Sequence, residues 1–152
     1  METRADDIRT LNGLIANVFD SADGYRTAAR NAENPRYATL FSELASSRLS
    51  LATSLQDEVS ALGGNPEDEG TALAAAHRGF LRLRDAVTGG SDQSVLAELD
   101  RGESYLTEKF DAALAADGLS ETVRTTISTA AQRVHRDHDR IEELRTNRGE
   151  AI

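Results

Sequence analysis

Two polar side chains interrupt the apolar stripes that otherwise predict buried helix faces. Glu103 lies between Leu99 and Leu106 in one stripe, and His138 interrupts a second stripe nearer the C-terminus. Burying a carboxylate or an imidazole costs free energy unless the group is paired or bound to a metal ion. These two residues are therefore the first candidates for a metal site or for a structural ion pair.

Two more carboxylates extend the candidate site. Asp23 and Glu43 lie at about equal distances from the turn near Asn34, so we expect them to face one another and to point toward the core. Carboxylates provide hard oxygen ligands and histidine adds a neutral nitrogen. The metal interpretation therefore places iron or manganese on Asp23, Glu43, Glu103 and His138.

This candidate ligand set is incomplete. A di-metal site in a helical bundle takes one Glu from each of two helices and a Glu-x-x-His pair from each of the other two. Here Glu43 is followed three residues later by Ser46, and the matching pair near the C-terminus has the amide of Gln132 in place of a carboxylate. Three alternatives stay open. Glu103 and His138 form a structural buried polar cluster that fixes helix register, or a weak or mononuclear metal site, or part of a working di-metal centre.

Apolar residues at spacings of three and four predict long amphipathic helices along the chain. The expected helices cover residues 4–32, 35–62, 71–88, 92–116 and 121–147. Short connections join the first two and the last two, which predicts two antiparallel hairpins, and the crossover between them contains the short fifth helix, 71–88. An all-α four-helix bundle with one long crossover is the ferritin-like arrangement.

Local signals mark several helix ends. Asn34 and Pro35 predict the N-cap and first turn of the second helix, while Gly118 and Ser120 predict the stop and the cap before the last one. Gly102 stands within a predicted helix, where glycine costs about 1 kcal/mol relative to alanine. We therefore expect another helix to approach closely at Gly102.

Composition excludes several classes of function. The 152 residues, enough for a single domain over 1–152, include 26 acidic and 17 basic residues, and the net charge of -9 argues against a nucleic-acid partner. The absence of cysteine excludes disulfides, iron–sulfur clusters and thiol nucleophiles. A polar start and the lack of an apolar run of about 20 residues predict a cytoplasmic protein with no signal peptide and no membrane span.

Enzyme motifs are also missing. The chain contains no G-x-S-x-G, no phosphate loop and no dinucleotide fingerprint, so we assign no catalytic residue and no organic cofactor. Within the connector, Arg78 and Arg82 flank Phe80, which makes the helix expected there a candidate surface for a protein partner.

Several short stretches together resemble a known family. They are Leu11-Asn12-Gly13-Leu14-Ile15, Asp23-Gly24-Tyr25-Arg26-Thr27-Ala28-Ala29, Leu62-Gly63-Gly64-Asn65-Pro66, His77-Arg78-Gly79-Phe80, Arg101-Gly102-Glu103 and His138-Asp139-Arg140-Ile141. The chain resembles a bacterial four-helix-bundle family catalogued as a domain of unknown function in the ferritin-like superfamily. The positions that match the family's signature are Asp23, Tyr25, His77, Gly102, Glu103 and His138.

The resemblance implies a ferritin-like fold, self-association as a homodimer or small oligomer and a link to bacterial stress responses, but no established activity. Family members often carry Glu where this chain has the shorter Asp23. Our leading interpretation is a non-enzymatic ferritin-like bundle. The alternatives are a metal-binding redox or storage protein and an interaction module that uses the connector helix.

Overall fold

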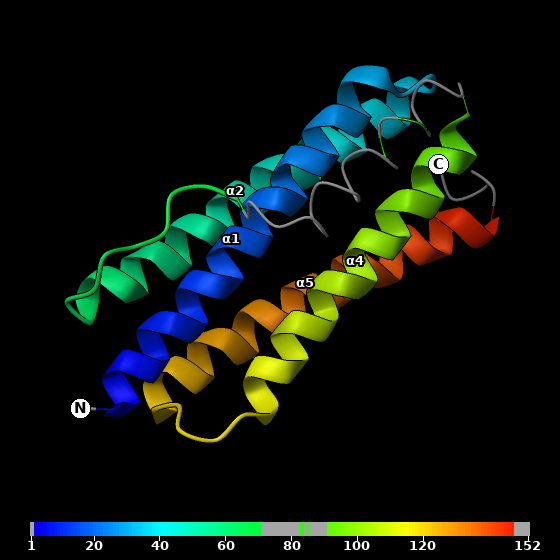
Figure 1. Cartoon of the computed structure of the whole chain (residues 1–152). Coiled ribbons are helices and arrows are strands. Elements are labelled where there is room, and N and C mark those ends of the chain that lie inside the picture. The colour runs from blue at the N-terminus through cyan, green and yellow to red at the C-terminus, as the bar shows by residue number, and fades with distance from the viewer. Residues whose placement is uncertain (1, 71–82, 84, 86–90, 148–152) are drawn as a thin grey trace.

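The part of the chain that the structure describes forms four long helices at the positions that the periodicity predicts (Figure 1). The computed structural model describes residues 2–70, 83, 85 and 91–147. The helices are α1 (Glu2–Asn31), α2 (Pro35–Ala61), α4 (Asp92–Ala115) and α5 (Glu121–Asn147). The helix expected over 71–88 and the connector surface at Arg78, Phe80 and Arg82 lie outside the described residues, Leu83 and Asp85 excepted.

The helices form two hairpins that pack against each other (Figure 1). The first hairpin is α1 with α2 and the second is α4 with α5; α1 also packs on α4, and α2 on α5. Both α2 and α4 begin at the end of the bundle where the α1–α2 turn meets Asp92. They therefore run in the same direction, and residues 62–91 lead from the far end of α2 back to the start of α4.

The predicted helix caps are confirmed at the turns within both hairpins. The Asn34 side chain accepts a hydrogen bond from the Arg36 backbone N–H at 2.9 Å, and Pro35 is the first residue of α2. The Ser120 hydroxyl accepts from the Val123 N–H at 3.3 Å, after Gly118 turns the chain with a φ of 97°. Each hairpin thus has its turn encoded by local chemistry.

Two carboxylates connect the hairpins at opposite ends of the bundle. At one end, Asp92 of α4 accepts hydrogen bonds from the backbone N–H groups of Glu33 and Asn34 at 2.9 and 3.0 Å. At the other end, the buried Asp7 of α1 accepts from the Ser120 N–H at 3.0 Å, just before α5 begins. These bonds fix how far one hairpin can slide along the other.

The hydrophobic core is divided into two clusters along the bundle axis. One contains Leu14, Val18, Leu55, Phe110, Ile127 and Val134, and the other contains Tyr25, Phe41, Leu96, Leu99 and Ile141. Between them each helix places one polar residue: Ser21, Arg48, Glu103 and Asp137. We call these four residues the central polar layer.

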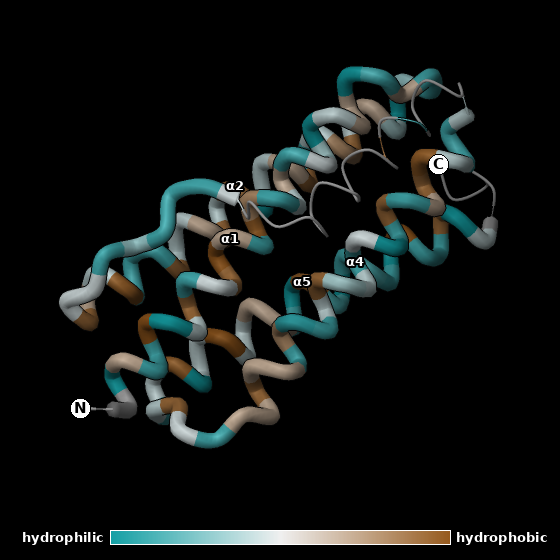
Figure 2. The backbone as a smooth tube through the Cα atoms, viewed as in Figure 1, coloured by the Kyte–Doolittle hydropathy of each residue, from teal (hydrophilic) through white to brown (hydrophobic). Residues whose placement is uncertain are grey.

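Hydrophobic and hydrophilic residues alternate along the helices (Figure 2), and most of the buried residues are hydrophobic. This is the pattern of an amphipathic bundle whose outer faces meet water. Among the described residues, no helix has a stretch apolar enough to cross a bilayer.

Gly102 does not mark a close approach of helices, and that expectation is wrong. The residue is exposed on α4, and outside its own turn a Cβ atom built there would meet no atom of the described residues within 4 Å. The glycine therefore reduces helix propensity with no packing gain in return.

Candidate functional site

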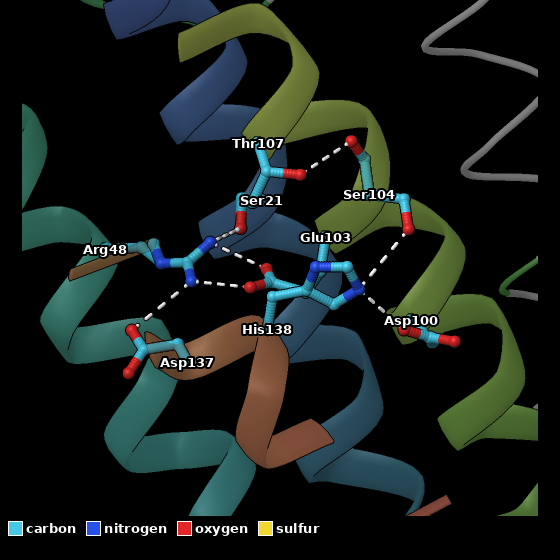
Figure 3. Close-up of polar contacts among 8 residues, drawn as sticks. All are labelled: Ser21, Arg48, Asp100, Glu103, Ser104, Thr107, Asp137 and His138. Carbon is cyan, nitrogen blue, oxygen red and sulfur yellow. Dashed lines mark hydrogen bonds and ion pairs between the residues drawn. The ribbon is translucent and has the colours of Figure 1, made fainter. Parts of the chain in front are cut away.

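The centre of the bundle holds a buried ion pair between Arg48 of α2 and Glu103 of α4 (Figure 3). Arg48 Nη1 donates to Glu103 Oε1 and Nη2 donates to Oε2, both at 2.7 Å. The two side chains are only 1% and 2% exposed. This bidentate geometry is the strongest that arginine and a carboxylate adopt.

The remaining members of the central polar layer complete the coordination of the guanidinium. Arg48 Nη1 also donates to Ser21 Oγ at 2.8 Å, and Nη2 lies 3.3 Å from Asp137 Oδ2. The ring of Tyr25 lies 5.5 Å from the guanidinium carbon, close enough for a cation–π contact. The network therefore joins all four helices through one arginine.

The charge of Glu103 changes the pKa values of two neighbouring groups, Arg48 and Tyr25. Burial alone lowers the pKa of Arg48, but the charge and hydrogen bonds of Glu103 more than offset that effect, so the pKa lies above its ordinary value. Burial raises the pKa of Tyr25 well above its ordinary value, and the negative charge of Glu103 adds to that rise. Arg48 therefore stays charged and Tyr25 stays neutral at physiological pH.

His138 belongs to a second polar group, nearer the bundle surface. Its Nε2 lies 2.8 Å from Asp100 Oδ1 and 3.3 Å from Ser104 Oγ. The other carboxylate oxygen of Asp100 pairs with Arg145. Glu103 and His138 thus take different partners, Arg48 for the first and Asp100 for the second (Figure 3).

Asp23 and Glu43 do not join the other two predicted ligands, and the expectation that they point toward the core is wrong. Both are exposed, and Asp23 pairs with its helix neighbour Arg26 at 3.2 Å. The physical reason is helical rotation: Ala22 and Leu44 occupy the inward faces, and the adjacent residue turns outward. Of the four predicted ligands, Glu103 is buried and His138 is half-buried, whereas Asp23 and Glu43 are exposed.

Sequence reasoning missed Arg48, the residue that balances Glu103. The signal is a gap in the apolar stripe of α2, where the spacing from Leu44 to Leu51 leaves one inward position for Arg48. A search restricted to carboxylates and histidines passes over it. The sequence pattern does not single out Asp100 and Asp137 either, because they lie at the edges of the inward faces of α4 and α5 and do not interrupt an apolar stripe.

Among the described residues, two groups of three could hold a metal ion by ligand spacing. One is Asp100, His138 and Glu142, whose ligand atoms lie within 4.8 Å of one another. The other is the run Glu67, Asp68 and Glu69. The first combines residues from two helices, whereas the second is a short acidic segment of the chain after α2.

Comparison with known protein families identifies the family to which the chain belongs. Residues 6–116, more than half of its length, match the model of a family described as a domain of unknown function (DUF2383), and the chain belongs to that family. The matched range covers most of α1, all of α2 and all of α4, and it ends before α5, so the resemblance at His138 lies beyond it. No curated protein matches the chain significantly.

Proposed function

We propose that this member of the DUF2383 family is a non-enzymatic helical bundle of the ferritin-like type, in which the central polar layer holds the helices in register. Bundle proteins with metal-dependent activity place their ligands at the centre of the core, on facing helices. In this chain that position is occupied by an arginine and its carboxylate partners. In this proposal the central polar layer fixes the register of the helices and does not catalyse a reaction.

The bidentate pairing of Arg48 with Glu103 carries this proposal. Both oxygens of Glu103 accept hydrogen bonds from the guanidinium at 2.7 Å, and Asp137 lies against the same group. A metal ion would need those oxygen lone pairs, and it would have to approach a fixed positive charge in a medium of low dielectric. The internal cation therefore neutralises the carboxylates that a metal would use.

Helix direction supports the ferritin-like assignment. Because α2 and α4 run in the same direction, one long connection must cross the length of the bundle between the two hairpins. A single long crossover is the topology of ferritin-like bundles. We further propose self-association as a homodimer or small oligomer and a role in bacterial stress physiology, which rest on the family resemblance.

The alternative is a metal-binding redox or storage protein that uses iron or manganese at Asp23, Glu43, Glu103 and His138. It remains a prediction. It would require Asp23 and Glu43 to leave the exposed faces that they occupy and Glu103 to release Arg48.

Elemental analysis distinguishes the two functions. Wild type and Glu103→Gln should be purified without chelator and analysed for iron and manganese by mass spectrometry. We expect the same metal content in both, together with a lower melting temperature for the variant. Stoichiometric iron or manganese that disappears in Glu103→Gln would overturn the proposal. Asp137→Asn, at the half-buried edge of the layer, provides a milder second variant.

A further inference from the structure

We infer that Asp100, His138 and Glu142 form a surface-accessible site for one divalent transition-metal ion, which would link α4 to α5. One donor atom from each residue lies within 4.8 Å of the other two. Three protein ligands with open positions for water are the usual composition of an accessible metal site. This site is separate from the central polar layer, and the inference goes beyond the proposed function.

The helix geometry prepares these ligands. His138 and Glu142 are four residues apart on α5, so they lie on one helix face one turn apart. Asp100 projects from the first half of α4, and its Oδ1 lies 2.8 Å from His138 Nε2. Two donors bound to one ion at about 2.1 Å lie roughly 3.0–3.4 Å apart. The observed pair needs only a small outward adjustment to admit an ion.

The surroundings orient the ligands and leave a path from solvent. Asp100 is buried, His138 is half-buried and Glu142 is exposed, so the site is lined with protein on its inner side and reached by water on its outer side. Ser104 Oγ lies 3.3 Å from His138 Nε2, and Arg145 holds the second oxygen of Asp100. The ion pair with Arg145 limits the motion of Asp100 before the ion arrives, and the ion would take the place of the Ser104 hydroxyl at His138 Nε2.

Local charge favours a cation. Asp100 and Glu142 contribute two negative charges and Arg145 contributes one positive charge, so these three side chains carry a net charge of about -1. Arg145 is half exposed, so its side chain can turn toward water when an ion takes its place near Asp100. This charge balance contrasts with Glu103, whose two oxygens are both occupied by a buried arginine.

The donor types define the class of metal. One imidazole nitrogen and two carboxylate oxygens suit Zn²⁺ and the neighbouring divalent ions Mn²⁺, Fe²⁺ and Co²⁺. Mg²⁺ and Ca²⁺ prefer oxygen ligands alone, and they should bind much more weakly.

Titration calorimetry with ZnCl₂ tests the site in the full chain, first stripped of metal with a chelator. Wild type should bind one ion, and both Glu142→Gln and His138→Gln should lose at least about 10-fold in affinity. Glu143→Gln and Glu69→Gln are matched controls on the same helix and in the acidic segment after α2, and both should bind as wild type does. Co²⁺ should bind at the same stoichiometry.

Two results would overturn the inference: no binding by wild type, or binding that Glu142→Gln and Glu143→Gln reduce equally. Because Glu142 is exposed, its substitution should leave the fold intact, and circular dichroism of each variant checks this. Metal lost in Glu142→Gln but retained in Glu103→Gln would support the site and leave the proposed role of the central polar layer unaffected. Metal lost in Glu103→Gln alone would contradict both.

Discussion

Arg48 and Glu103 meet at the centre of the bundle through two parallel hydrogen bonds of 2.7 Å, between the two hairpins and between the two apolar clusters. This pair depends on the relative position of the helices as well as on the opposite charges of its two members. Because each helix contributes one residue to the central polar layer, shifting any helix along its axis would separate a donor from its acceptor.

Removing one partner of this pair should be costly. Arg48→Met leaves Glu103 buried without its cation, and we expect the free energy of unfolding to fall by about 3–5 kcal/mol. Urea denaturation followed by circular dichroism measures the change. The matched control is Arg26→Met, which breaks the exposed pair with Asp23 and should cost less than about 1 kcal/mol. Equal losses in the two variants would contradict the structural role of the layer.

The Asp7 carboxylate should stabilise the start of α5. Asp7→Ala removes the acceptor of the Ser120 N–H, so we expect a loss of about 1–3 kcal/mol in unfolding free energy. Asp6→Ala is the control, because Asp6 pairs with its helix neighbour Arg9 at the surface. If both substitutions have equally small effects, the contact between α1 and the α4–α5 turn does not hold the hairpins together.

Gly102→Ala should raise stability. The position is helical and exposed, and a Cβ atom there would meet no described residue beyond its own turn within 4 Å, so the gain is about 0.5–1 kcal/mol. Gly118→Ala should do the opposite, because Gly118 has a φ of 97° that alanine adopts only with strain. Thermal denaturation of both variants checks the two signs. A destabilised Gly102→Ala would mean that the glycine serves a purpose that its exposed position does not show.

The buried phenol of Tyr25 should make the free energy of unfolding decrease at alkaline pH. Its pKa in the folded state is raised, chiefly by burial and then by Glu103, above the ordinary value of 10.0. Below that pH the phenol is neutral in both states and stability is unaffected. Above it the unfolded chain releases the proton first, so the free energy of unfolding falls as pH rises.

Tyr25→Phe should make this alkaline decline shallower, while Tyr105→Phe, at an exposed position, should leave it as in wild type. Denaturant midpoints measured between about pH 9 and pH 11 provide the comparison. A decline of the same slope in Tyr25→Phe and wild type would show that the buried phenol is not its source.

The fold was readable from sequence because its signals are local. Apolar spacing and the capping residues Asn34, Pro35 and Ser120 define helices whose observed bounds lie within two residues of those expected. Bundle topology followed from the lengths of the connections. Gly102 differs from the expectation because glycine within a helix suggests a close contact with another helix, whereas the structure places this glycine at the exposed surface of α4.

The sequence predicts only part of the site, because residue spacing along one helix does not show which side chains of other helices lie next to it. Glu103 is predictable because it interrupts an apolar stripe. Its partner Arg48 belongs to the other hairpin, and as a cation it is not among the residue types that bind metal ions. The expectation for Asp23 and Glu43 rests only on their equal distance from the turn near Asn34. A rotation of about 100° per residue around each helix decides whether a side chain faces the core.

The most direct test is the unfolding free energy of the double variant Arg48→Met/Glu103→Leu, measured beside both single variants. If the pair serves register and carries no ligand role, apolar side chains of similar volume should restore stability to within about 1 kcal/mol of wild type or above it, while each single variant loses about 3–5 kcal/mol. A double variant that loses as much as the two single variants together would contradict this account, because Arg48 and Glu103 would then act independently.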